Sequence, residues 1–141
     1  MTAPARPRPR TVRTPDEIAA EQDEAALQRA IMVAIGSLPG VCVHRNNIGT
    51  ARYDSGARVE YGVGGKGAPD LVVEVLTPGH PNGTWACVWM EVKTADGALS
   101  REQKQWHAAA EKMGRHVYVV REVRDAVAVV EGFRMGSVVR P

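Results

Sequence analysis

The sequence has few of the residues that define several large protein classes. It contains two cysteines and one phenylalanine among 141 residues, and aromatic residues make up 5% of it. A disulfide-rich secreted fold needs more cysteines, and a membrane-spanning helix needs about 18 or more consecutive apolar residues, a run that is absent. The first ten residues have arginines but no apolar segment, so we expect no secretory signal. The composition predicts a small cytoplasmic protein with one core.

Familiar metal and nucleotide motifs are missing too. The four histidines have no zinc-ligand spacing, and there is no glycine-rich phosphate-binding loop of the Walker type. Cys42 and Cys87 each fall within an apolar run, where we expect a small buried thiol and not a metal ligand or a disulfide. We therefore expect neither a zinc site nor a nucleotide cofactor.

The formal net charge of +2 is unevenly distributed. Residues 1–14 carry four arginines and no acid. Without these four, 14 basic residues stand against 16 acidic ones, a net charge of −2. Because proline alternates with arginine in this segment, we predict a disordered arm, which is either a plain solvated terminus or a segment that contacts phosphates.

The most informative motif is Glu91-Val92-Lys93. It follows residues 85–90, which are apolar at every position and predict a strand buried on both faces. Because side chains alternate along a strand, Glu91 and Lys93 point to one side and Val92 to the other. An exposed edge strand with paired charges is the alternative explanation.

Asp70 precedes the apolar run Leu71-Val72-Val73 and starts a predicted strand at about 70–76, and a Pro/Gly-rich segment at 78–83 separates this strand from the one at 86–93. The pattern predicts an antiparallel hairpin whose turn lies far from the acids. Antiparallel pairing then brings Asp70, at the start of one strand, beside Glu91, near the end of the other. Two carboxylates and a lysine in one volume are what a magnesium-dependent phosphodiesterase requires. Asp70 taken alone is also compatible with a simple turn residue.

A long helix is predicted at residues 15–37, before a Pro-Gly stop. Glu24 lies on its apolar stripe, so we expect the carboxylate to face the protein, with Glu21 as a substitute and an ordinary helix-face acid as the alternative. A strand at 41–43, a polar loop at 46–57 and a short strand at 59–61 are predicted to follow. The residues of the apolar stripe are Leu27, Ile31, Ile35 and Leu38.

Ser100 and Gln103 have the spacing of a capping box that starts a second helix. Gln103 is thus either a cap residue only or a residue that also reaches the acids. Residues 116–120 predict a strand parallel to the Glu91 strand, and residues 123–131 a last helix. The fold class is α/β, a mixed sheet with helices on its faces. The inward residues of the second helix are predicted to be Trp106, Ala109, Ala110 and Met113.

Three segments together resemble a known family, the VRR-Nuc branch of the PD-(D/E)xK nucleases, and in particular its small stand-alone members from phages and prophages. The resemblance runs from near Glu24 to about Glu131. It implies a restriction-endonuclease-like core in the order α-β-β-β-α-β-α, with a VRR-Nuc domain at 15–133, the arm at 1–14 and a tail at 134–141. The segments are Gly67-Ala68-Pro69-Asp70-Leu71-Val72, Glu91-Val92-Lys93-Thr94 and Gly97-Ala98-Leu99-Ser100-Arg101-Glu102-Gln103.

The resemblance and the charge pattern imply a metal-dependent DNA endonuclease. Asp70, Glu91 and the main-chain carbonyl of Val92 are expected to hold Mg²⁺. Mn²⁺ should substitute for it, whereas Ca²⁺ should bind without turnover. Glu24 is expected to hold a second metal ion through water. The resemblance also implies that Lys93 orients the attacking water and stabilises charge, and that Gln103 reaches the site.

DNA contact is expected from the segment between His44 and Lys66, where basic residues outnumber acids. A solvated charged loop is the alternative. No helix-turn-helix or zinc finger is present, so we expect recognition of DNA shape. The resemblance implies a homodimer that cuts Holliday junctions or other branched DNA in replication, recombination or repair, in a bacterial or phage-infected cell. The candidate DNA-binding residues are Arg45, Asn46, Asn47, Arg52, Arg58 and Lys66.

Two other functions fit the same residues. A nuclease-fold module without activity could bind nucleic acid or a partner protein, and a metal-dependent hydrolase could act on another phosphate ester. The complete set of Asp70, Glu91 and Lys93 argues against the first. The absence of a small-molecule cofactor motif argues against the second.

Overall fold

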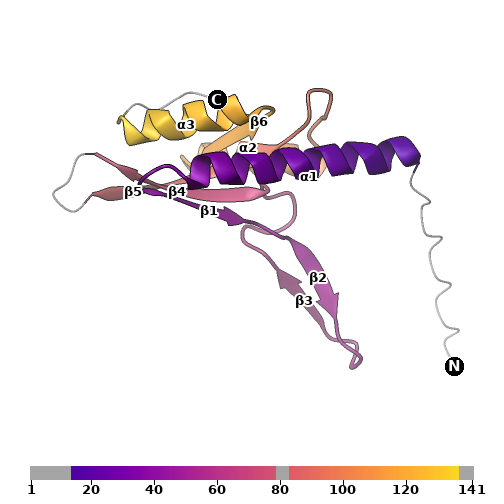
Figure 1. Cartoon of the computed structure of the whole chain (residues 1–141). Coiled ribbons are helices and arrows are strands. Elements are labelled where there is room, and N and C mark those ends of the chain that lie inside the picture. The colour runs from indigo at the N-terminus through magenta and orange to yellow at the C-terminus, as the bar shows by residue number, and fades with distance from the viewer. Residues whose placement is uncertain (1–13, 79–82, 137–141) are drawn as a thin grey trace, which may run out of the picture.

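The structure is a computed structural model that describes residues 14–78 and 83–136 (Figure 1). None of the helices in these residues is long and apolar enough to cross a membrane. Residues 1–13 of the predicted arm and residues 137–141 of the predicted tail lie outside the described residues, and Arg134, the first residue of that tail, ends α3. The elements in chain order are α1 (Pro15–Gly36), β1 (Val41–Arg45), β2 (Gly49–Arg52), β3 (Arg58–Tyr61), β4 (Leu71–Thr77), β5 (Thr84–Val92), α2 (Arg101–Lys112), β6 (His116–Val120) and α3 (Val123–Arg134).

Four strands make the main sheet, in the order β1-β4-β5-β6. β4 and β5 pair antiparallel, with Leu71 opposite Met90 and Thr77 opposite Thr84, so the predicted hairpin is confirmed. β6 pairs parallel to β5, as the crossover through α2 requires. β5 is therefore an interior strand, and the alternative of an exposed edge for Glu91 is wrong.

Helices cover the two faces of the sheet unequally. α1 and α3 pack on one face, where Ile31 and Ile35 of the predicted apolar stripe are fully buried. α2 packs on the other face against Trp89. Because side chains alternate to the end of β5, Val92 points toward α1 and α3, and Glu91 points to the opposite side, where α2 begins.

β2 and β3 form a separate two-stranded ribbon that projects from the body beyond the end of β1 (Figure 1). The prediction of a loop across 46–57 was wrong at Gly49–Arg52, since these residues pair with Arg58–Tyr61. A ribbon with both faces largely exposed has no buried side that would impose an apolar alternation on its sequence. The predicted order α-β-β-β-α-β-α holds for the body, whose strands are β1, β4, β5 and β6.

Predictions of burial were wrong on the α2 face of the sheet. Cys42 and Cys87 are exposed, because α2 is one short helix and covers only part of this face. Met113, the C-cap of α2, is 70% exposed, and Ala109 within the helix is exposed as well, whereas His107 is buried. The face of α2 that is buried depends on how the helix packs on the sheet, which its own spacing does not encode, so the inward face differs from the predicted one.

Candidate active site

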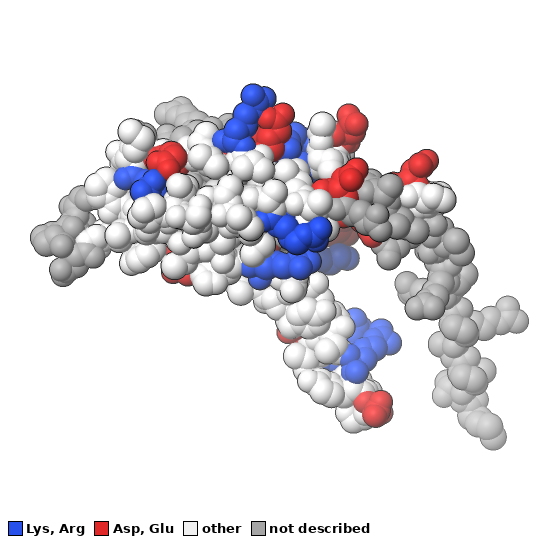
Figure 2. All heavy atoms as spheres, viewed as in Figure 1, with Lys and Arg blue, Asp and Glu red and all other residues white. Residues whose placement is uncertain are grey.

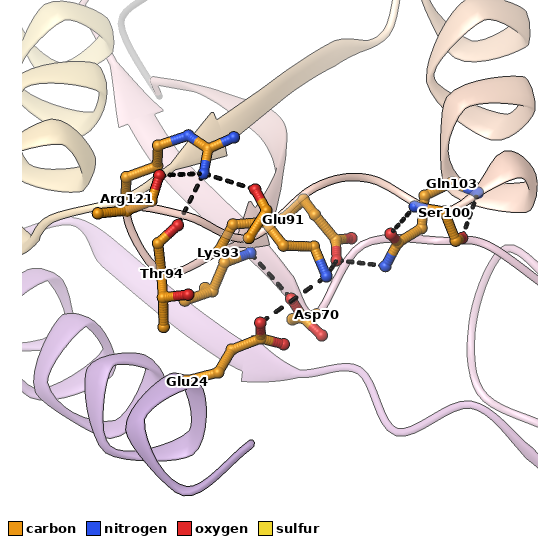
Figure 3. Close-up of polar contacts among 11 residues, drawn as sticks. Glu24, Asp70, Glu91, Lys93, Thr94, Ser100, Gln103 and Arg121 are labelled. Carbon is orange, nitrogen blue, oxygen red and sulfur yellow. Dashed lines mark hydrogen bonds and ion pairs between the residues drawn. The ribbon is translucent and has the colours of Figure 1, made fainter. Parts of the chain in front are cut away.

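Asp70 stands at the entrance to β4 and is held from both neighbouring strands. Its main-chain carbonyl accepts the Asn46 N–H at 2.7 Å, just beyond the end of β1. Its carboxylate accepts the N–H of Val92, the last residue of β5, at 2.8 Å. Asp70 is thus fixed next to Glu91, as the hairpin predicted, and does not merely shape a turn (Figure 3).

Glu91 is a buried carboxylate, with a side chain that is 1% exposed. Gln103 Nε2 donates to its Oε1 at 2.6 Å, but Oε2 has no hydrogen-bond partner among the described residues. Burial, and after it the nearby Asp70 carboxylate, raises the pKa of Glu91 to about 8, and Lys93 opposes this rise only in part. Glu91 therefore favours its protonated form at neutral pH, and positive charge brought near it would favour the ionised form.

Lys93 lies directly after β5, with its Nζ 3.5 Å from Glu91 Oε1 and 3.8 Å from Glu24 Oε2 (Figure 3). The Lys93 side chain is 11% exposed, so its ammonium is inside the site and not in bulk water. Glu24 faces inward from α1, as its place on the apolar stripe predicted. Burial raises the pKa of Glu24, while Lys93 lowers it. α1 thus supplies a third carboxylate on the more exposed side of Lys93.

Gln103 has both of the roles considered from the sequence. In the capping box of α2, the Gln103 N–H donates to Ser100 Oγ at 3.1 Å, and the Ser100 N–H donates to Gln103 Oε1 at 2.7 Å. The same side chain donates through Nε2 to Glu91. The first turn of α2 is therefore fixed relative to the acids.

A solved structure has the same architecture. A chain described as "VRR_NUC domain" matches with a TM-score of 0.52 and 23% sequence identity, over 78% of this chain and 96% of that chain. The protein has a VRR_NUC-type fold. No protein-family model matches the sequence, and no curated protein matches it significantly. The predicted restriction-endonuclease-like α/β class is confirmed at the level of the fold.

In this VRR_NUC-type fold, Arg121 holds the turn after Lys93, a role that the sequence did not suggest. Its Nη1 donates to the carbonyls of Thr94 and Gly97 at 2.7 Å each and to that of Ala95 at 3.3 Å. Gly97 lies beside Lys93, since a Cβ added at Gly97 would be 3.4 Å from Lys93 Cδ. Arg121 therefore fixes the backbone next to Lys93. The partners are 24 to 27 positions apart in sequence, so no local pattern reveals them.

Asn46, one of the predicted DNA contacts, has its amide engaged within the fold. Its Oδ1 accepts the Val63 N–H at 2.9 Å, and its Nδ2 donates to the carbonyls of Val63 at 2.8 Å and Pro69 at 3.0 Å. These bonds tie the glycine-rich loop to the end of β1 just before Asp70. Asn46 is therefore a positioning residue, and its contact with DNA stays a prediction.

The other predicted DNA contacts lie along the ribbon and around its root, where Figure 2 shows Lys and Arg atoms. Arg45 ends β1, and Arg52 and Arg58 are a directly opposed cross-strand pair on the ribbon. Asn47 is exposed between β1 and β2, and Lys66 is 83% exposed. These side chains are accessible to a large anionic partner.

The acidic residues fit a magnesium site that has few protein ligands. No group of three or more His, Cys, Asp or Glu side chains in residues 14–78 and 83–136 is arranged to hold a metal ion. Magnesium, however, is usually held by one or two carboxylates and several waters. Asp70 and Glu91 are such a pair, and the unpaired Glu91 Oε2 is a buried oxygen that lacks a partner. The carbonyl of Val92 as a further ligand stays a prediction.

Proposed function

We propose that the protein is a metal-dependent endonuclease that hydrolyses phosphodiester bonds in DNA. The observation that carries this proposal is the buried Glu91 carboxylate, whose Oε2 lacks a partner beside Asp70 while Lys93 lies 3.5 Å from its other oxygen. A purely structural acid would have both oxygens satisfied. An acid with a strongly raised pKa next to a second acid and a cation is typical of a functional site. The VRR_NUC-type fold supports the same conclusion.

Asp70 and Glu91 are the residues that would hold Mg²⁺, or Mn²⁺ in its place. When bound, the cation supplies Lewis acidity and makes hydroxide available near neutral pH. Glu91 ionises more readily in its presence, because positive charge offsets the burial and the Asp70 charge that raise the pKa of Glu91. We assign Glu24 to a second ion, held through water.

Lys93 orients the attacking water and stabilises the negative charge that develops on the phosphate. Its ammonium lies between the carboxylates of Glu91 and Glu24 and is little exposed. An ammonium has three donors and no acceptor, so in this state Lys93 positions water and does not take its proton. Preorganised charge of this kind is effective because it does not have to reorient during the reaction.

The proposed substrate is branched DNA, including Holliday junctions, in replication, recombination or repair. The exposed arginines of the ribbon offer a surface for phosphates, and no motif that reads base sequence accompanies them. Paired cuts in a four-way junction require two active sites, so we propose a homodimer. The setting would be the cytoplasm of a bacterial or phage-infected cell.

End-labelled linear, flapped and four-way DNA, incubated with purified protein and Mg²⁺, tests the proposed function. We expect cleavage by the wild type, and none in EDTA, with Ca²⁺ alone or by Asp70→Asn. Asp23→Asn is the matched control, because Asp23 is exposed on α1, and it should cut as the wild type does. Wild-type cleavage rates in Asp70→Asn, or no cleavage of any substrate by the wild type, contradict the proposal.

A DNA-binding module without activity is the second candidate function. The ribbon favours it, because Arg52 and Arg58 need no active site to bind phosphates. A gel shift that weakens with salt, together with no cleavage under any divalent cation, would identify this function.

A further inference from the structure

A concavity of about 580 Å³ lies where the ribbon meets the glycine-rich loop that leads to the active site. Arg58 and Tyr61 of the ribbon and Gly65 and Lys66 of the loop are among the residues that line it. We propose that this concavity binds an unpaired nucleotide of a DNA strand and guides that strand to Asp70. The inference rests on the proposed nuclease function and names the kind of strand that the site receives.

The size and charge of the concavity suit a single nucleotide. A space of this volume holds a small-molecule-sized group, whereas a stacked duplex does not enter it. Arg58 and Lys66 supply two positive charges against the single carboxylate of Glu60. The ion pair of Lys66 with Glu102 is 3.4 Å long and largely exposed, so a phosphate can replace it at little cost.

The Arg58 side chain has no ion pair or hydrogen bond with any of the described residues, and Arg58 lies directly opposite Arg52. Like charges in directly opposed positions destabilise a strand pair. An isolated two-stranded ribbon has no core of its own and is only marginally stable, so the ribbon itself supplies little that would offset this repulsion. A bound phosphate would offset the repulsion between the two arginines. Phosphate binding would therefore explain why two arginines are opposed here, which the stability of the fold does not.

Tyr61 supplies an aromatic surface in the same concavity. The ring is 50% exposed, and it packs against the backbone of Gly49, where any side chain would collide with the ring. Gly49 does not adopt a positive φ, so its lack of a side chain serves to leave space for Tyr61. A positively charged groove with an aromatic platform is how single strands are bound without sequence preference.

The loop connects this concavity to the acids. Gly67 packs so closely on the backbone of α2 that a side chain there would collide with the Glu102 carbonyl. Trp106 Nε1 donates to the Gly64 carbonyl at 2.8 Å. The loop is thus fixed on α2, and it continues directly into Asp70. A DNA strand bound in the concavity would therefore lie on the loop that leads to Asp70.

Fluorescence anisotropy in EDTA tests the proposal separately from cleavage, with a labelled oligothymidylate and a labelled hairpin duplex as probes. Tyr61→Leu should weaken oligothymidylate binding by about 10-fold and leave duplex binding unchanged. Arg58→Gln should weaken binding of the oligothymidylate and reduce its salt slope by about 0.7. Arg124→Gln is the matched control, because Arg124 is exposed on α3 and pairs with Glu122, and it should bind both probes as the wild type does.

Gly49→Ala is a second variant, which displaces the Tyr61 ring without removing any functional group, and it should repeat the effect of Tyr61→Leu. Circular dichroism melting checks that each variant is folded. Wild-type affinity for oligothymidylate in both Tyr61→Leu and Gly49→Ala, or an equal loss on the duplex, overturns the proposal. Because no metal is present, a wild type that fails to cut DNA counts against the nuclease function and not against this binding result.

Discussion

Replacement of Glu91 by glutamine should stabilise the metal-free protein at alkaline pH. The glutamine side chain has the same size, and its oxygen can still accept the hydrogen bond from Gln103. The substitution removes the negative charge that burial and Asp70 disfavour. It also removes a carboxylate from the proposed metal site. One change should therefore stabilise the fold and abolish cleavage.

The magnitude follows from the pKa of Glu91, which is raised from 4.5 to about 8. The folded state holds the Glu91 proton more tightly than the unfolded chain does. This contribution to the free energy of unfolding is fully present below pH 4.5 and is lost progressively as the pH rises to about 8. At about 1.4 kcal/mol per pH unit, the loss is at most about 5 kcal/mol. Because relaxation of the folded protein around the ionised carboxylate lowers this figure, we expect about 2–4 kcal/mol at pH 8, or ~6–12 °C in Tm.

Thermal unfolding in EDTA, followed by circular dichroism between about pH 5 and pH 8, measures the difference between the wild type and Glu91→Gln. The difference in Tm should be small at the acid end and should grow with pH. Mg²⁺ added at the alkaline end should raise the Tm of the wild type and leave that of Glu91→Gln nearly unchanged. Glu111→Gln, on the exposed surface of α2, is the matched control. A Tm difference that does not vary with pH would refute the argument.

Lys93→Gln should lower kcat by about 100-fold with little change in DNA affinity, because the ammonium acts on the charge that develops during the reaction. Single-turnover cleavage measures the first effect and anisotropy the second. A loss confined to affinity contradicts this role. Ser100→Ala and Gln103→Ala should each cost about 1 kcal/mol in denaturant unfolding, since both break the cap of α2, but only Gln103→Ala should also lower kcat markedly. Equal kcat losses would mean that the cap alone matters. Arg121→Gln should lower kcat about 10-fold, because it releases the turn that follows Lys93. The control Arg124→Gln should have no effect. Unchanged cleavage by Arg121→Gln rules out the positioning role.

The centre of the site could be predicted because its residues are joined by short, regular structure. Glu91 and Lys93 share one side of their strand because side chains alternate. β4 ends at Thr77 and β5 begins at Thr84, so the two strands are close in sequence, and their antiparallel pairing places Asp70 beside Glu91. Gln103 could be predicted as a cap because the capping box spans only one turn of helix.

The ribbon and α2 were predicted less well because their local patterns carry little information. Gly49–Arg52 pairs with a second exposed strand, so no apolar alternation marks it as a strand. α2 turns His107 inward and leaves Met113 exposed, because the position of the helix on the sheet, and not its own periodicity, selects the buried face.

By itself, the sequence determined the strands of the main sheet, the hairpin and the charges of Glu91-Val92-Lys93, because backbone periodicity and turn chemistry act over a few residues. Only the tertiary structure decided that Glu91 Oε2 is buried without a partner, that Arg121 anchors the turn after Lys93, and that Asn46 holds the loop before Asp70. Burial and contacts between distant segments depend on how the layers pack together, which the spacing within one segment does not encode. The residue types thus come from the sequence, whereas the exclusion of water that raises the pKa of Glu91 comes from the fold.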